Sequence, residues 1–393
     1  MEKVKLGDVS KLINGDRGKN YPSQADITEE GEIPFVNAGH LNGREIDFSE
    51  MNYISQDKYD NLRSGKFQEG DILYCLRGSL GKKAIVSNDV NGAIASSLVI
   101  IRPDKEKVDG EYLMFALDSP AIKEQLVKAN NGSSQPNLSA SSVREYQVEL
   151  PNISVQKEVV EKLIKVRNII DCRRKELQLL DSLIKARFVE MFGDAVDNPM
   201  GWEKRQLQEI VTDDCTISYG IVQTGDDQEE GVPVFRPVDI VNRVPKLDEL
   251  KKTTEEISNK YKRTVLKGRE MLITVRANIA DTYIIGEEFK GCNVGRGIVP
   301  IRTKEDIMVL EFLKYLMDSK HLNDKIKSKA KGITLIQLNM EDLREVELIV
   351  PPLEQQKVFV EFANQVNKSK FAVQKTLEQT QTLFDSLMQK YFG

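Results

Sequence analysis

The sequence has very few of the side chains on which metal sites and histidine-based catalysis depend. Its 393 residues include two histidines, His40 and His321, and four cysteines that are scattered without C-x-x-C spacing. A Ser/His/Asp or Cys/His catalytic set is not expected from so few histidines. Neither a zinc site nor a disulfide framework is expected from cysteines spaced in this way. We therefore expect a protein of the cytoplasm.

Long apolar runs and cofactor-binding loops are missing as well. No run approaches the roughly 20 apolar residues of a membrane span, and residues 1–5 are not followed by the apolar segment of a signal peptide. Residues 78–83 lack the G-x-x-x-x-G-K-S/T spacing of an ATP site, and no glycine-rich loop has the spacing for a dinucleotide or S-adenosylmethionine. These absences predict a non-catalytic binding protein with no cofactor and no metal in this chain.

An excess of positive charge is also missing. The net charge is −5, with 18 basic and 23 acidic side chains in residues 1–150, and 24 basic and 26 acidic side chains in residues 201–350. Affinity for nucleic acid must therefore come from local patches or from a partner subunit. One patch is a run of lysines that leads into residues 332–334, and a solvated helix face is its alternative interpretation. Its members are Lys320, Lys325, Lys327, Lys329 and Lys331.

What the sequence does contain is a repeat at an offset of 200 residues. Four pairs of short segments match at this offset: 117–119 with 317–319, 150–151 with 350–351, 156–157 with 356–357, and 192–193 with 392–393. A repeat of this length indicates two similar structural units in one chain. Whatever one half binds, the protein is then expected to bind at two places.

Each copy begins with about 150 residues of mixed α/β character. Short apolar runs at 72–76, 98–101 and 298–301 are separated by Gly, Asn, Asp and Pro, which predicts short strands. Short helices are predicted near residues 111–117 and 310–317. We expect the binding residues in the polar loops between the strands, because a rigid sheet holds such loops in position.

Each copy ends with a long segment of helical character, free of Gly and Pro from 152 to 192 and from 353 to 392. Apolar residues recur there at alternating spacings of four and three, which indicates a coiled-coil seam. The seam residues are Val159, Leu163, Val166, Ile170, Leu177, Leu180 and Ile184 in the first copy, and Phe362, Val366, Val373, Leu377, Phe384 and Leu387 in the second. We expect the two helices to pack antiparallel through a pseudo-two-fold axis, as a rod between two heads. Asp-Ser-Leu at 181–183 returns at an offset of 204, which predicts a second helix four residues shorter.

Two kinds of polar loop recur between the predicted strands. In the first kind an arginine, Arg77 or Arg276, follows a buried strand and precedes small residues. Such a guanidinium can reach a phosphate or a guanine edge, although an arginine that binds loop carbonyls is the alternative. The second kind, residues 131–139 and 331–339, is rich in Ser, Thr, Gln and Asn. These side chains contact base edges and phosphates, but they are equally ordinary in turns and helix caps.

The order of these features resembles that of the specificity subunit of type I restriction–modification systems, over essentially the whole chain. The most telling segments are Gly-Asp-Ile-Leu…Arg-Gly…Gly at 70–81, Gly-Ser-Ser-Gln-Pro-Asn-Leu at 132–138 and Pro-Pro-Leu-Glu-Gln-Gln at 351–356. A Gly-Trp-Glu segment at 201–203 restarts the pattern. The second head departs from it, with Ala280 and Asp281 in place of Gly81 and Lys82, and Ile333 in place of Ser133. Divergence of this kind fits two heads that read different sequences.

The resemblance implies an α+β fold: two similar mixed α/β globular target recognition domains, separated by a long antiparallel two-helix coiled coil with internal pseudo-two-fold symmetry. It assigns residues 1–150 and 194–350 to the two target recognition domains. Residues 151–193 become a central conserved helix and residues 351–393 a distal one. The helices are implied to set the spacer between two half-sites and to dock partner subunits.

As a function, the resemblance implies sequence-specific binding of double-stranded DNA, one half of an asymmetric bipartite site per head. The implied partners are two methyltransferase subunits, which use S-adenosylmethionine, and restriction or translocase subunits, which use ATP and Mg. The candidate DNA-binding residues are Arg77, Ser79, Lys82, Lys83, Ser133, Ser134, Gln135 and Asn137 in the first head, and Arg276, Asn278, Lys329, Lys331, Thr334, Gln337 and Asn339 in the second.

Two other classes of protein stay open at this point. A self-contained DNA methyltransferase or nuclease requires a cofactor motif that this sequence lacks. A coiled-coil scaffold whose heads bind protein is compatible with the composition, although two heads with divergent loops are better explained by two different DNA sequences.

Overall fold

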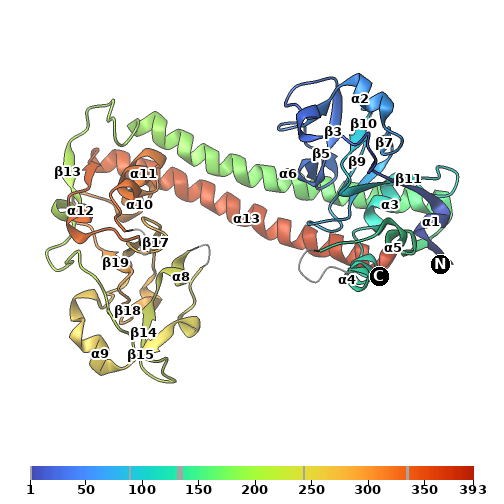
Figure 1. The fold of residues 1–393 in the computed structure, drawn as a ribbon. Helices are drawn as coiled ribbons and strands as arrows, with labels where there is room; N and C mark the ends of the chain where they lie inside the picture. Colours follow the sequence, from blue (N-terminus) through green and yellow to red (C-terminus); the bar gives the residue numbers. More distant parts are fainter. Residues whose placement is uncertain (1, 88–89, 131–135, 242–243, 333–335) are drawn as a thin grey trace. The chain divides into compact units, whose positions relative to one another are not determined.

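Two compact units make up the chain, of which the computed structural model describes residues 2–87, 90–130, 136–241, 244–332 and 336–393. The first unit comprises Met1–Arg174 with Gln374–Gly393, and the second comprises Lys175–Val373. Each unit is a globular head together with one segment of each long helix, α6 (Ile153–Phe192) and α13 (Leu353–Phe392) (Figure 1).

The first head is built on two small sheets. One is antiparallel with the strand order β2–β11–β8–β9, and the other has the order β6–β3–β10–β7, in which β3 and β10 are parallel. The strands are β2 (Ser10–Asn14), β11 (Leu98–Pro103), β8 (Ile72–Cys75), β9 (Lys83–Ile85), β6 (Tyr53–Ile54), β3 (Ile33–Val36), β10 (Gly92–Ile94) and β7 (Lys66–Phe67). All of β8 and the first four residues of β11 are buried, as expected for apolar runs in the centre of a sheet.

The remaining elements of the first head surround these sheets. Two further strand pairs are β1 (Glu2–Lys5) with β12 (Gln147–Leu150), and β4 (Leu41–Asn42) with β5 (Glu45–Ile46). The helices are α1 (Leu6–Val9), α2 (Gln56–Asn61), α3 (Gly110–Ala116), α4 (Pro120–Ala129) and α5 (Ala140–Arg144). Helix α3 occupies the position predicted near 111–117.

The second head repeats the same plan. Strand β16 lies between β17 and β19 as β8 lies between β9 and β11, and β14 pairs in parallel with β18 as β3 does with β10. The strands are β13 (Lys204–Gln206), β14 (Val232–Phe235), β15 (Lys251–Thr253), β16 (Met271–Thr274), β17 (Thr282–Ile284), β18 (Asn293–Val294), β19 (Ile298–Ile301) and β20 (Glu347–Ile349). The helices are α7 (Leu207–Ile210), α8 (Pro237–Ile240), α9 (Glu255–Lys260), α10 (Leu310–Met317), α11 (Lys320–Ser328) and α12 (Met340–Arg344). The prediction of two similar mixed α/β heads is confirmed.

The long helices begin and end where the sequence predicts. Asn152 follows Pro151, and its side-chain oxygen accepts a hydrogen bond from the Val155 amide at 3.0 Å, which caps α6. Gly193 ends α6 with a φ of +72°, a left-handed conformation that glycine adopts without strain. The prediction of a shorter second helix was wrong, because both helices have 40 residues and both bounds differ by 200. The shifted Asp-Ser-Leu is a change of sequence within the helix and not of its length.

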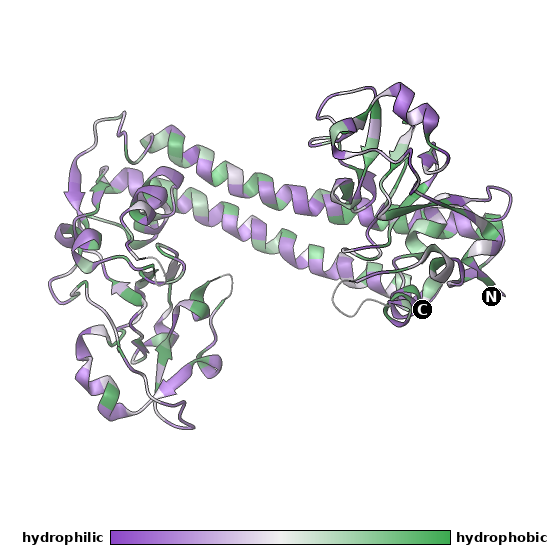
Figure 2. Ribbon diagram, viewed as in Figure 1, coloured by the Kyte–Doolittle hydropathy of each residue, from purple (hydrophilic) through white to green (hydrophobic). Residues whose placement is uncertain are grey.

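Segments of α6 and α13 pack antiparallel within each unit. In the first unit, Val159 and Leu163 of α6 share one apolar core with Phe392 and Met388 of α13. In the second, Lys370 pairs with Asp181, and Phe359 packs against Phe188 with ring centroids 5.4 Å apart. Hydrophilic and hydrophobic residues alternate along both helices (Figure 2). No helix of the described residues is both long and apolar enough to cross a membrane.

The predicted seam residues all lie at least partly out of solvent. Val159, Leu163, Ile170, Ile184, Val366 and Val373 are buried. Val166, Leu177, Leu180, Phe362, Leu377, Phe384 and Leu387 are half-buried. The aromatic residues Phe188, Phe192 and Phe359, which the seam pattern omits, are also buried. They pack against Phe312 of the head, with centroids of Phe192 and Phe312 4.8 Å apart, and so join the helix pair to the head.

A buried glutamine ties each long helix to its head. The Gln156 side chain accepts a hydrogen bond from the Asp109 amide at 2.8 Å, and it donates to the carbonyls of Lys107 and Pro151. Gln356 repeats this arrangement in the second unit, where it accepts from the Val309 amide and donates to the carbonyls of Ile307 and Pro351. Both glutamines are fully buried. The repeat of Gln156 at 356 is therefore explained by backbone groups that only an amide can satisfy together.

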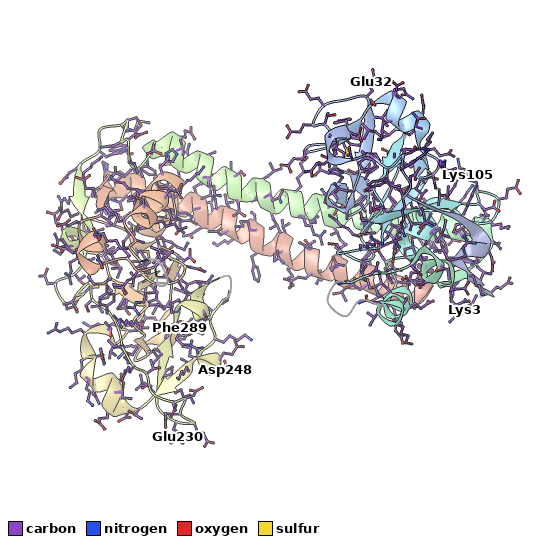
Figure 3. The ribbon with its side chains drawn as sticks, in the orientation of Figure 1. Lys3, Glu32, Lys105, Glu230, Asp248 and Phe289 are labelled. Atoms are coloured by element: carbon purple, nitrogen blue, oxygen red, sulfur yellow. The ribbon has the colours of Figure 1, made fainter. Side chains whose placement is uncertain are left out.

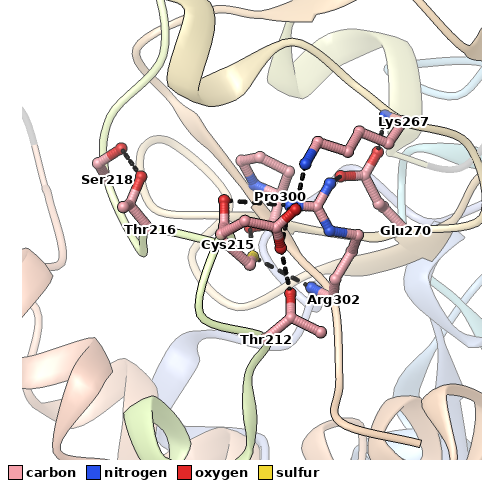
Figure 4. Close-up of polar contacts among 9 residues, drawn as sticks. Thr212, Cys215, Thr216, Ser218, Lys267, Glu270, Pro300 and Arg302 are labelled. Atoms are coloured by element: carbon pink, nitrogen blue, oxygen red, sulfur yellow. Dashed lines mark hydrogen bonds and ion pairs between the residues drawn. The ribbon is translucent and has the colours of Figure 1, made fainter.

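A charged cluster supports the sheet of the second head (Figure 4). Arg302 donates to the carboxylates of Glu270 at 3.0 Å and Asp214 at 3.1 Å, and its amide donates to the thiol sulfur of Cys215. Hydrogen bonds from Lys267 and Thr212, together with the charge of Arg302, lower the pKa of Asp214 to about 2. Burial raises the pKa of Glu270 and outweighs the effect of Arg302. These charges are engaged within the fold.

Candidate nucleic-acid interface

In the first head, the described residues of the two kinds of polar loop lie side by side. Strand β8 runs into Leu76, whose carbonyl accepts a hydrogen bond from the Leu138 amide at 2.8 Å. Arg77 and Asn137 then form an isolated antiparallel bridge, and the Gly78 amide donates to the Pro136 carbonyl at 3.2 Å. Residues 77–83, here called the arginine loop, and residues 136–138, about 60 residues further along the sequence, thus lie against one another.

The second head has the same backbone arrangement with different side chains. The Leu338 amide donates to the Val275 carbonyl at 2.9 Å, and Arg276 forms an antiparallel bridge with Gln337. The guanidinium of Arg276 donates to the amide oxygen of Gln337, whose amide nitrogen donates to the hydroxyl of Tyr219 at 2.6 Å. Partial burial lowers the pKa of Arg276. A network of arginine, glutamine and tyrosine therefore stands where the first head has an arginine beside an asparagine.

The turn after each arginine uses two left-handed residues. In the first head these are Gly78 and Gly81, with φ of +79° and +77°. In the second they are Ala277 and Ala280, with φ of +62° and +63°. Left-handed alanine costs roughly 1–2 kcal/mol relative to its usual conformation. The substitution of glycine by alanine in the second head therefore changes the strain of the turn but not its path.

A cleft of about 460 Å³ opens beside the arginine of the first head. Besides Arg77 and Asn137, it is lined by Arg17, Arg144 and Ser139, among others, and the described residues that line it include no carboxylate. Sequence reasoning missed Arg17 and Arg144, as it missed Tyr219. Arg144 has a counterpart, Arg344, at the offset of 200, so the repeat could have revealed it. Arg17 and Tyr219 carry no such signal, because only the folded chain brings them to the loop.

The other predicted residues of the first arginine loop differ in exposure. Ser79 is exposed, and the Lys82 ammonium donates to the Ala38 carbonyl at 3.0 Å. The side chain of Lys83 is 4% exposed and forms an ion pair with Asp118, and burial lowers its pKa. An ammonium held in this way is not available to DNA, so the structure favours a structural role for Lys83. Ser133, Ser134 and Gln135 lie outside the described residues.

In the second head, the predicted residues spread over the loop and the helices that flank it. Asn278 is exposed, and its backbone carbonyl accepts a hydrogen bond from the Thr274 hydroxyl. The lysines flank α11 and the loop: Lys329 is half-buried, whereas Lys331 is exposed and lies 3.8 Å from Asp342. Asn339 is exposed at the start of α12, where its side chain donates to Asp342 at 3.4 Å. Thr334 lies outside the described residues.

Metal ligation has no candidate among the residues that the structure describes. Their His, Cys, Asp and Glu side chains form no group of three or more that could hold a metal ion. Of the four cysteines, Cys75, Cys215 and Cys292 are buried and Cys172 is exposed, and all four are free thiols. What the two loop surfaces offer is hydrogen-bond donors and acceptors together with positive charge. Such donors, acceptors and positive charges are the groups with which proteins contact base edges and phosphates.

Comparison with known proteins identifies relatives over the whole chain. A family model described as the type I restriction modification DNA specificity domain matches residues 1–181 and again residues 199–380. The specificity subunit of the type I restriction enzyme MjaVIII from Methanocaldococcus jannaschii is 23% identical over 384 residues, which cover 92% of this chain and 84% of that protein. The EcoBI specificity subunit from Escherichia coli is 24% identical over 294 residues, which cover 68% of this chain and 62% of that protein.

Solved structures share the fold. A chain from a study of complex assembly and conformational transition of the type I R-M system aligns with a TM-score of 0.62 at 22% identity, and covers 100% of this chain and 97% of its own length. The S subunit of a type I restriction–modification system from M. genitalium aligns with a TM-score of 0.59 at 14% identity, and covers 100% of this chain and 96% of its own. At such identities the likeness concerns the fold.

Proposed function

The chain belongs to the family of type I restriction–modification DNA specificity proteins, and we propose that its two heads read two different halves of one bipartite DNA site. One observation carries this proposal. The same backbone pairing presents Arg77 with Asn137 in one head and Arg276 with Gln337 in the other. Arginine pairs with guanine and asparagine or glutamine with adenine in the major groove, so a common frame with different side chains is suited to two different half-sites.

In this proposal residues 1–150 and 194–350 are the target recognition domains. Their reading surface includes Arg77, Ser79, Lys82 and Asn137 in the first head, and Arg276, Asn278, Lys329, Lys331, Gln337 and Asn339 in the second. Lys83 is left out, because its ammonium is buried against Asp118. Ser133, Ser134, Gln135 and Thr334 stay candidates from the sequence alone.

The helices of residues 151–193 and 351–393 are proposed to set the spacer between the half-sites and to dock two methyltransferase subunits. Apolar side chains on the outer faces of both helices support the docking. Leu179 is 60% exposed, Val358 53% and Phe371 75%. Large apolar side chains exposed on long helices are typical of surfaces that a partner covers.

The chemistry of modification and cleavage is assigned to the partners. S-adenosylmethionine is proposed to bind the methyltransferase subunits, and ATP with Mg the restriction or translocase subunits, while this chain acts in the cytoplasm without a cofactor. If the purified chain alone bound S-adenosylmethionine with micromolar affinity in a calorimetric titration, a self-contained methyltransferase would replace this assignment.

The test substitutes one arginine at a time in the chain produced with its partner subunits. Arg77→Ala and Arg276→Ala are each expected to relax the preference at one half of the methylated site by roughly 1–3 kcal/mol, which is about 5- to 150-fold, and to leave the other half unchanged. The measurement is the sequence of methylated sites in a library of random DNA, read by sequencing that detects modified bases.

Lys105→Ala and Arg205→Ala are the matched controls. Both side chains are basic. Lys105 is an exposed residue of the first head (Figure 3) and is not among the residues that line the cleft beside Arg77, and Arg205 is paired with Glu203 in the second head. Neither control is expected to change either half-site. An equal loss for all sequences in both arginine variants contradicts base reading by these residues.

A further inference from the structure

The cleft beside Arg77 concentrates positive charge without compensation. Arg17, Arg77 and Arg144 line it, all three side chains are exposed, and none forms an ion pair with a residue that the structure describes. The neighbouring Asp16 is not among the residues that line the cleft, and its carboxylate accepts hydrogen bonds from the amides of Gly18 at 2.8 Å and Arg63 at 2.9 Å. Three guanidinium groups around one cleft repel one another unless an anion enters.

The position of Arg144 is set by close packing. It is the last residue of α5, whose first turn is capped by the Ser139 hydroxyl accepting from the Ser142 amide at 2.9 Å. Its aliphatic stem lies against Gly7, where an added Cβ would come within 2.2 Å of the Arg144 Cγ. A side chain larger than hydrogen at position 7 would therefore displace the stem, and glycine allows the guanidinium to reach the cleft.

The equivalent arginines of the second head each donate one hydrogen bond within the protein. Arg344, the counterpart of Arg144, donates to the Ile217 carbonyl at 2.6 Å. Arg276, the counterpart of Arg77, donates to Gln337. The two heads thus share the same backbone arrangement, but more guanidinium donors are available to a ligand in the first head than in the second.

We propose that Arg17 and Arg144 form a phosphate-binding site in this cleft, beside the base-reading Arg77. This site anchors the backbone of duplex DNA at the first head, and the second head contributes less of this sequence-independent binding. The inference rests on the proposed function and deepens it. The cleft offers uncharged donors as well, among them Asn14 and Ser139, which suit phosphate and sugar oxygens. Since the net charge of the chain is −5, a local concentration of positive charge such as this cleft favours the binding of a polyanion.

The experiment measures the salt dependence of binding to duplex DNA of random sequence, with the full chain and any partner subunits that co-purify. Arg17→Gln and Arg144→Gln are each expected to lower the slope of log K against log salt by about 0.9, or about threefold in salt sensitivity between about 50 and 200 mM. Arg144→Lys is expected to keep the slope, because the slope depends on the number of positive charges placed against phosphates and lysine keeps that charge. The sequence of the methylated sites is expected to stay unchanged in all three variants.

Arg344→Gln is the matched control from the second head. It removes the same charge, but its guanidinium is held by the Ile217 carbonyl, so the slope is expected to stay as in the wild type.

The inference is overturned if Arg17→Gln and Arg144→Gln leave the slope unchanged, or if Arg344→Gln lowers it as much. A loss of partner subunits with an unchanged slope assigns the cleft to a protein contact and also overturns it. These outcomes leave the proposed function intact, since that depends on the half-site preferences of Arg77→Ala and Arg276→Ala; a complex without any affinity for duplex DNA overturns both.

Discussion

At the scale of single residues, the two heads use one frame for different chemistry. The arginine that follows the buried strand was predictable from the sequence in both heads, as were Asn137 and Gln337. Their direct pairing was not, because it depends on backbone hydrogen bonds between loops about 60 residues apart. Lys83 is a residue whose predicted role in DNA binding the structure does not favour. Its charge is visible in the sequence, but the partner that buries it, Asp118, is brought to it only by the fold.

The buried glutamines give the sharpest prediction for stability. Gln356→Leu keeps the approximate size of the side chain but leaves the Val309 amide and the carbonyls of Ile307 and Pro351 without their partner. An unsatisfied buried polar group costs about 1–3 kcal/mol. We therefore expect the free energy of unfolding to fall by roughly 3 kcal/mol, as measured by urea denaturation of the full chain.

Gln355→Leu is the control for this substitution, since Gln355 is the neighbouring residue and is exposed. It is expected to change the free energy of unfolding by less than about 0.5 kcal/mol. Equal effects of the two substitutions would show that the hydrogen bonds of Gln356 do not stabilise the junction between head and helix.

At the scale of elements, the long helices were the most predictable part of the fold. A Pro before each helix and a Gly after it mark the ends, and the spacing of Val159, Leu163 and Ile170 marks the buried face. The predicted loss of four residues was wrong, because a shifted motif inside a helix leaves its ends in place. The aromatic residues Phe188 and Phe192 were not predicted, since they pack against the head as well as the facing helix.

The outer face of α6 carries a prediction about partners. Leu179 and Leu183 are one helical turn apart on the same face, 60% and 46% exposed. The double substitution Leu179→Ser with Leu183→Ser is expected to reduce the co-purification of methyltransferase subunits at least tenfold. The melting temperature of the chain is expected to change little, because these side chains are exposed in the chain alone.

Gln178→Ser is the control for the docking prediction, since Gln178 is an exposed polar residue of the same helix. It is expected to keep the partners bound. If the double variant retained them at the wild-type level, the docking surface would have to lie elsewhere on the chain.

At the scale of the whole molecule, the repeat at an offset of 200 predicted two similar units, and two units are present. The long helices run through both units, so each unit contains one head together with one segment of α6 and one segment of α13. The positions at which the copies agree, such as Gln156 with Gln356, maintain the frame. The positions at which they differ, such as Asn137 and Gln337, are where we expect the two half-sites to be distinguished.

The most direct test of two independent reading heads is the exchange of residues 1–150 for the corresponding head of a relative. The complex is produced in cells without other modification systems, and the methylated sites of the genome are read by sequencing. One half of the recognised sequence is predicted to change to that of the relative, while the other half and the spacer stay the same. A change in both halves, or in neither, would contradict the account.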